Sequence, residues 1–133
     1  MAWGGNPFGQ LNVPELPADV TYVAAEAGYG HNLALRSDGN VVAWGFNTSG
    51  QTNVPSLPAG LVYTAVSAGE SHSLALRSDG SIVAWGSNGT NQLIVPELPA
   101  GISYTGLSAG PYHNLALRSD GSLVAWGSNS AGQ

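Results

Sequence analysis

The chain has 133 residues, of which 43% are hydrophobic and 8% are charged, and it contains neither lysine nor cysteine. The net charge of −5 and the three arginines leave no basic stripe that could neutralise phosphates, so we expect no nucleic-acid partner. The lack of cysteine excludes disulfides and cysteine-ligated zinc, but it leaves the compartment in which the protein works undetermined.

Neither the N-terminal residues nor the apolar runs give a membrane signal. The first ten residues, MAWGGNPFGQ, lack the positive and apolar regions of a signal peptide. No apolar run approaches the roughly 18 residues that a membrane-spanning helix needs. We therefore expect an unanchored chain with no membrane partner.

A pattern of 41 residues repeats along the whole chain. Residues 3–43, 44–84 and 85–125 align without a gap, and 22 of the 41 positions are identical in all three copies. Residues 126–133 begin a further copy and duplicate the phase of residues 3–10. The 19 glycines and 8 prolines are too many for pairs of helices. We therefore expect residues 1–133 to form a single all-β repeat domain.

The middle copy shows the expected elements in chain order. A short strand around residues 50–54 runs into the loop VPSLPAG, whose prolines do not suit a central strand. Strands of alternating or β-branched character follow at 61–69, 72–77 and 81–86, with the turn Ser78-Asp79-Gly80 between the last two. Four short antiparallel strands per 41 residues predict a β-propeller blade, with the Trp and Leu positions packed between neighbouring blades.

One position of the repeat indicates a tight turn. Gly9, Gly50 and Gly132 occupy it in three places, and Asn91 replaces them in the fourth. Asparagine is the residue that best tolerates the left-handed backbone conformation after glycine. We therefore expect a positive φ at all four residues.

The segment SAGESHSLALRSDGSIVAWGSN and its counterparts resemble the regulator-of-chromosome-condensation repeat family. Within that family they are closest in style to bacterial members and to the propeller-type β-lactamase inhibitory protein. The resemblance covers essentially the whole chain. It implies a propeller, typically of seven blades, that binds other proteins through its blade loops.

Three blades cannot close a ring, and an open arc exposes an apolar face and unpaired strands at both ends. We therefore expect the ring to be closed by oligomerisation. A homodimer of six blades is favoured because propellers commonly have four to eight, and a trimer is the alternative. Residues 1–10 and 124–133 share one phase, so one of these two segments is surplus when chains join end to end. This redundancy also supports a competing hypothesis, an engineered, reconstructed or excised scaffold that has no ligand of its own.

All histidines and arginines lie in the repeated phrase that ends in LALRSDG. We expect the histidines to bond loop backbone, with a metal site as the alternative, because equivalent residues of successive blades lie apart. The arginines are expected to pair with the turn aspartates, with an anion-binding ring as the alternative. The residues assigned structural roles are Trp3, Trp44, Trp85, Trp126, His31, His72, His113, Arg36, Arg77, Arg118, Asp38, Asp79 and Asp120.

Residues that differ between the copies indicate where function resides. The sequence contains no catalytic motif, so we expect no enzymatic activity, no catalytic residue and no cofactor. With strands that alternate in direction, the loops after the strands at 61–69 and 81–86 and their equivalents share one face, and there the copies differ. Varied loops with aromatic residues on a rigid scaffold suit binding of a protein or ligand, although drift would give a similar pattern. The candidate binding residues are Phe8, Tyr29, Phe46, Glu70, Pro111 and Tyr112.

Overall fold

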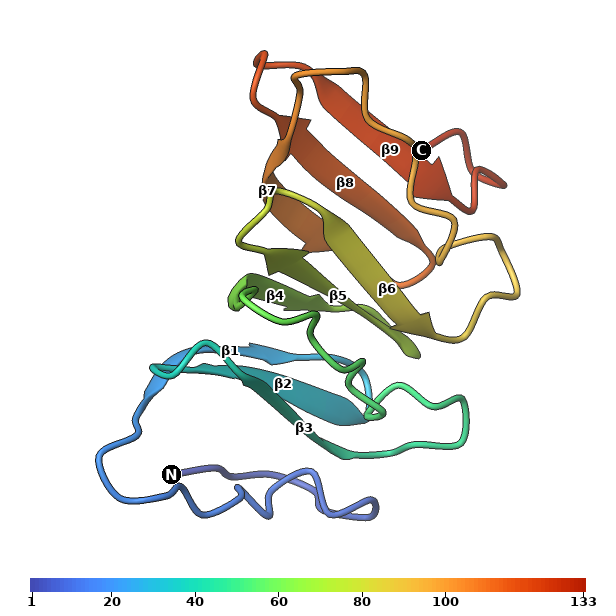
Figure 1. Cartoon of the computed structure of the whole chain (residues 1–133). Helices are drawn as coiled ribbons and strands as arrows, with labels where there is room; N and C mark the ends of the chain where they lie inside the picture. Colours follow the sequence, from blue (N-terminus) through green and yellow to red (C-terminus); the bar gives the residue numbers. More distant parts are fainter.

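The computed structural model describes residues 1–133 and contains nine strands and no helix, so nothing in it has the length of helix needed to cross a membrane. The strands are β1 (Tyr22–Ala27), β2 (His31–Arg36), β3 (Val41–Gly45), β4 (Tyr63–Ala68), β5 (His72–Arg77), β6 (Ile82–Gly86), β7 (Tyr104–Ala109), β8 (His113–Arg118) and β9 (Leu123–Gly127). They form three antiparallel sheets in the orders β1-β2-β3, β4-β5-β6 and β7-β8-β9. The sheets stack in a fanned arc with the two termini at opposite ends (Figure 1).

The three main strands of each copy agree with the sequence analysis to within two residues at either end. The predicted turn at Ser78-Asp79-Gly80 also forms: the Gly80 amide donates to the Arg77 carbonyl at 3.0 Å, and Gly80 has a φ of 79°. The Asp79 carboxylate accepts the Ser81 amide at 2.9 Å, which holds the turn closed. Short-range hydrogen bonds and one left-handed glycine therefore set the register of β5 and β6.

The fourth strand expected around residues 50–54 does not form, and each sheet has three strands. In this segment the Asn53 amide donates to the Gly50 carbonyl and the Val54 amide to the Thr52 carbonyl, both at 3.0 Å. The donors are thus used inside the segment, and Pro55, the next residue, has none. Too few free amides remain for a ladder, so the segment lies beside the sheet as a turn and an extended tail.

The predicted left-handed turn is confirmed at all four positions. The φ angles are 74° at Gly9, 77° at Gly50, 62° at Asn91 and 81° at Gly132. At Asn91 the amide donates to the carbonyl of Asn88 at 3.2 Å, as the glycines do in their own turns. Asparagine therefore reproduces the glycine conformation without changing the turn.

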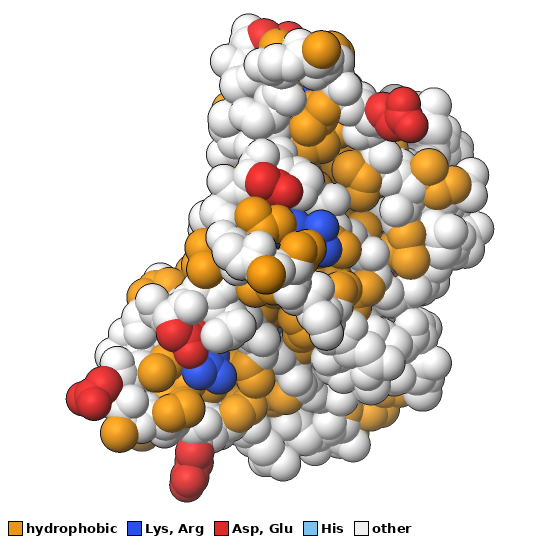
Figure 2. Space-filling model, viewed as in Figure 1, with side chains coloured by type: hydrophobic (Ala, Val, Ile, Leu, Met, Phe, Trp, Pro, Cys, Tyr) orange, Lys and Arg blue, Asp and Glu red, His pale blue; other side chains and the backbone are white.

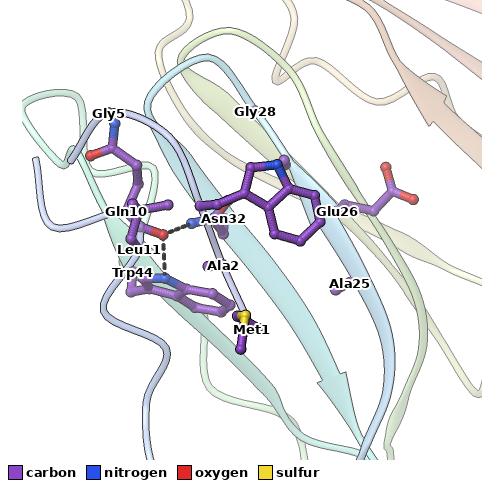
Figure 3. A pocket seen from close by; sticks show the side chains of 12 residues that line it. Met1, Ala2, Gly5, Gln10, Leu11, Ala25, Glu26, Gly28, Asn32 and Trp44 are labelled. Atoms are coloured by element: carbon purple, nitrogen blue, oxygen red, sulfur yellow. Dashed lines mark hydrogen bonds between the residues drawn. The ribbon is translucent and has the colours of Figure 1, made fainter.

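Each outer segment is fixed to the three strands that follow it in the chain. The Gln10 carbonyl accepts the Trp44 indole N–H at 3.0 Å and the Asn32 Nδ2–H at 2.7 Å, as the dashed lines in Figure 3 show. The Gln51 and Gln92 carbonyls accept Trp85 and Trp126 in the same way. We therefore describe each sheet together with the outer segment bonded to it as one blade, with Gln10 in the first, Gln51 in the second and Gln92 in the third.

The hydrophobic core lies between blades rather than within one sheet. In the first interface Leu33 and Leu35 of β2 pack against Tyr63, Val66 and other residues of the second blade. The second interface repeats this arrangement, with Leu74 and Leu76 of β5 against the third blade. Each blade is therefore stabilised chiefly by its neighbours, as expected when a single repeat cannot bury its own apolar face.

Candidate protein-binding face

The loops that connect the first two strands of each sheet lie side by side at one end of the blades. Residues 27–29, 68–70 and 109–111 together line a shallow hollow of about 200 Å³. The Glu70 amide donates to the Pro111 carbonyl at 3.4 Å, which links the second loop to the third. Residues 41 positions apart in sequence thus form one continuous surface.

Glycine is required at the start of the first two loops because the next blade approaches closely there. A Cβ on Gly69 would lie 2.8 Å from the carbonyl oxygen of Gly110 and would overlap the His72 ring. A Cβ on Gly28 would lie 2.5 Å from the Gly69 carbonyl oxygen. Neither separation is tolerated by a real side chain, so the backbones of successive loops stay in contact and the hollow stays shallow.

Two histidines support this face from below. His31 and His72 are buried, and their Nε2 atoms lie 3.0 Å from Ser73 Oγ and 2.7 Å from Asn114 Oδ1 of the next blade. Ser73 Oγ itself donates to the Gln51 carbonyl and Asn114 Nδ2 to the Gln92 carbonyl, so each must accept from a histidine Nε2–H. The sequence analysis expected the histidines to bond loop backbone. His31 and His72 instead bond a side chain of the neighbouring blade.

Burial keeps these two imidazoles neutral. Burial, together with the nearby His72 ring, lowers the pKa of His31 to about 4. Burial also lowers the pKa of His72, partly opposed by its bond to Asn114. No group of three or more His, Cys, Asp or Glu side chains gathers anywhere in the chain. The imidazoles therefore act as structural donors at the blade interface.

The arginines and aspartates lie at the opposite end of the blades, at the β2–β3 turn and its equivalents. Arg36 forms an ion pair with Asp38, whereas no such pair is found at the other two turns. Asp79 and Asp120 instead accept the hydroxyls of Ser81 and Ser122 at 2.6 Å. The basic atoms visible in Figure 2 lie next to acidic ones, and this view shows no continuous basic patch.

Two phenylalanines from different outer segments meet on the loop face of the first blade. The ring centroids of Phe8 and Phe46 are 4.6 Å apart with an interplanar angle of 53°. Gly30 lies beneath them, since a Cβ there would be 3.1 Å from Phe46 Cβ and 3.5 Å from Phe8 Cδ2. Next to Gly30, Tyr29 is 83% exposed. Phe8 and Phe46 therefore form an aromatic pair, and Tyr29 stands exposed next to the glycine beneath them.

The other three candidates form a second group over the third blade. Pro111 and Tyr112 are consecutive loop residues, and Glu70 reaches them from the second loop. A hydrogen bond to the Glu70 carboxylate raises the pKa of Tyr112. Thr90 Oγ1 also donates to the Tyr112 carbonyl at 3.2 Å. This part of the face joins an exposed phenol to a carboxylate.

Sequence reasoning missed the residues that organise the support beneath this face. Gln10, Gln51 and Gln92 each fix an outer segment, and Ser73 and Asn114 each bond the histidine of the preceding blade. A signal was present, because the position after each histidine alternates between Asn32, Ser73 and Asn114, residues that can each accept and donate at once. Only the contact across 42 residues identifies its partner.

Fanned three-stranded antiparallel sheets, packed face to face and joined by varied loops at one end, define a segment of a β-propeller. The chain belongs to the regulator of chromosome condensation (RCC1) repeat family. The family model matches residues 20–51, 63–92 and 104–133, which confirms the resemblance seen in the sequence.

Solved structures show the same architecture. The chain is similar to Prp20p from Saccharomyces cerevisiae, at 27% identity and a TM-score of 0.72 over 86% of this chain and 32% of that one. It is similar to the CRINKLY WD40 ectodomain of the Arabidopsis thaliana receptor kinase ACR4, at 25% identity and a TM-score of 0.70 over 95% and 45%. Human WBSCR16, at 22% identity and a TM-score of 0.77 over 93% and 41%, shows the fold alone.

The chain thus spans less than half the length of each of these proteins. The Prp20p structure was described together with that protein's binding to Gsp1p and histones. No curated protein sequence matches the chain.

Proposed function

We propose that this chain is a non-catalytic propeller segment that binds another protein through the loop face formed by Phe8, Tyr29, Phe46, Glu70, Pro111 and Tyr112. The observation on which this rests is the hollow in which Tyr29, Glu70 and Pro111, from loops of three successive blades, meet. Large side chains that remain exposed on loops held by a rigid scaffold are typical of protein-binding surfaces. The described binding of Prp20p to other proteins is in keeping with this proposal.

The charge of this face favours a partner that presents basic groups. Glu70 lies in the face, whereas all three arginines end their strands at the opposite end of the blades. A partner with lysine or arginine near an apolar patch would find a carboxylate and exposed aromatic rings, to which cations also bind. A nucleic-acid partner is not proposed, since the face offers no arginine or lysine to phosphates.

We also propose that the chain associates with itself to complete a ring, with a six-bladed homodimer favoured and a nine-bladed trimer as the alternative. The specific observation in favour is the exposure of large apolar side chains on the last blade, among them Leu115, Leu117 and Leu123. Their counterparts in the first two blades are covered by the blade that follows. Exposed apolar surface of this kind drives association.

The loop-face proposal is tested with a variant in which Tyr29, Phe46 and Tyr112 are changed to alanine. Immobilised wild-type and variant chains are compared for retention of proteins from a defined panel of basic and acidic candidates. Control substitutions to alanine are made at the opposite end of the blades, at the exposed loop positions Ser56, Glu97 and Asp120.

A basic partner that is retained by the wild type and the control, but not by the triple variant, supports the proposal. Retention by all three forms would mean that the loop face is not the binding site. A panel with no retained member favours the competing hypothesis of a scaffold that has no ligand of its own.

A further inference from the structure

The contact between successive blades follows one rule along the chain. Each buried histidine bonds the residue 42 positions ahead, His31 with Ser73 and His72 with Asn114. A second hydrogen bond repeats this spacing, because the Ala109 backbone amide donates to the side-chain Oγ of Ser67 at 3.0 Å. Blade faces thus meet in a single register that is specified by side chains.

The last blade presents the first half of this contact without a partner. His113 is only partly buried and opens into a hollow of about 260 Å³ at the end of the arc. Leu115 is 40% exposed, although its counterparts Leu33 and Leu74 are completely buried. A second hollow of about 220 Å³, with an almost wholly apolar lining, lies over Leu115, Leu117 and Leu123.

The first blade presents the other half. Asn32 occupies the position of Ser73 and Asn114, and its Nδ2 donates to the Gln10 carbonyl as Asn114 Nδ2 does to the Gln92 carbonyl. Its Oδ1, the atom that accepts histidine in Asn114, bonds nothing in the chain. Asn32 lines a hollow of about 420 Å³, which Ala25 and Trp44 also line (Figure 3). The two end faces are therefore complementary.

From this complementarity, and resting on the self-association proposed above, we infer that the last blade is a docking site for the first blade of a second copy of this chain, in the register that pairs His113 with Asn32. In this register His113 Nε2 donates to Asn32 Oδ1 of the second copy. Leu115 and Leu117 pack where Leu33 and Leu35 pack inside the chain, against the residues equivalent to Tyr63 and Val66. These equivalents are Tyr22 and Ala25 of the second copy.

A second copy is the occupant because the interface between copies continues one that the chain already forms twice. An unrelated apolar partner would bury the leucines but would not supply an acceptor that is itself held by a glutamine carbonyl. The pairing also gives His113 Nε2 and Asn32 Oδ1 a hydrogen-bond partner, which a docked apolar surface would not.

The test is the mass of the whole chain, measured by light scattering after size-exclusion chromatography across a dilution series. Leu115→Arg places a charge in the inferred interface and is expected to weaken association at least about tenfold. Val23→Arg is the matched control, because Val23 is 58% exposed and its counterparts Thr64 and Thr105 stay exposed inside the chain. Folding of every variant is checked by circular dichroism.

Two further variants test the register itself. His113→Ala removes the donor and is expected to weaken association about three- to tenfold. Asn32→Ser is expected to associate as the wild type does, because Ser73 already accepts a histidine in this position. If Leu115→Arg does not fold, His113→Ala still tests the register. The His113 ring is only partly buried, so its removal is expected to leave the fold intact.

A wild-type chain that stays monomeric across the series would overturn both the self-association and the inferred register. A wild-type oligomer that Leu115→Arg and His113→Ala weaken no more than Val23→Arg would overturn the register alone. Loss of association in the two test variants, with both controls unchanged, supports the inference.

Discussion

His72 donates a hydrogen bond from Nε2 to Oδ1 of Asn114 at 2.7 Å, across 42 residues of sequence and into the next blade. Asn114 in turn donates from Nδ2 to the Gln92 carbonyl, which also accepts the Trp126 indole. One amide side chain therefore connects the histidine of one blade with the strand and the outer segment of the next. The predictions below begin from this connection.

Asn114 makes two hydrogen bonds, one with His72 and one with the Gln92 carbonyl. We expect a replacement that can make neither bond to destabilise the chain more than one that can make both. Asn114→Leu leaves the buried His72 Nε2–H unpaired and should lower the free energy of unfolding by about 2–4 kcal/mol. Asn114→Ser should lower it by about 1 kcal/mol or less, because Ser73 makes both bonds in the preceding blade. Urea unfolding followed by tryptophan fluorescence gives both values. Equal losses in the two variants would contradict the proposed double role.

Stability is expected to fall as the solution is made acidic. The pKa of His31 is about 4 in the folded chain and about 6.5 when unfolded, so the unfolded state takes up the proton first. The stabilisation is complete above about pH 6.5 and is lost progressively toward pH 4, by up to about 3 kcal/mol for His31. His72, whose pKa is also lowered, acts in the same direction.

This dependence can be separated from that of the carboxylates. Hydrogen bonds from Ser81 and Ser122 lower the pKa of Asp79 and Asp120, so their contribution is lost only below about pH 3.8. Urea midpoints measured between pH 7.5 and 4.5 therefore report the histidines, and His31→Gln should flatten the curve. An unchanged slope in that variant would assign the acid sensitivity elsewhere.

Glycine-to-alanine substitutions in two different loops should have sharply different effects on the melting temperature. Gly69→Ala is expected to lower the melting temperature by about 6–10 °C, because its Cβ would lie 2.8 Å from the Gly110 carbonyl oxygen. Gly89→Ala should leave it unchanged or slightly raised, because a Cβ there meets nothing within 4 Å. Calorimetry of the two variants and the wild type makes the comparison. A similar shift in both would show that the loops do not pack as described.

Deletion of residues 2–4 is expected to strengthen self-association by about tenfold. These residues occupy the same positions of the repeat as Ala125–Gly127. In the inferred register, residues 2–4 of one copy would therefore compete with the end of β9 of the other copy for the same site. Met1, Ala2 and Trp3 also line the hollow beside Asn32, and Trp3 is 84% exposed. Light scattering of the shortened chain tests this. Weaker association on deletion would indicate that these residues join the interface instead of blocking it.

Much of the fold could be predicted from local patterns. The strands β4, β5 and β6, the turn at Gly80 and the left-handed conformation of Asn91 depend on alternation and on glycine-like residues, which are visible in a short window. The fourth strand could not be predicted correctly, because the failure of residues 50–54 to pair depends on how their amides are used within the turn. The candidate binding residues were expected to share one face, but the contact between Phe8 and Phe46 and the hydrogen bond from Glu70 to Pro111 were not anticipated.

The sequence by itself determined the 41-residue period, the all-β class and the family, since repetition and strand-like alternation are properties of the order of residues. Only the tertiary structure decided what the repeated histidines bond and that Phe8 meets Phe46. These contacts join residues of different blades, and the angle and separation at which two sheets pack are set by all the side chains between them. The repeated sequence shows that a histidine recurs in each copy. Only the packed blades show that its hydrogen-bond partner is the serine or asparagine of the next blade.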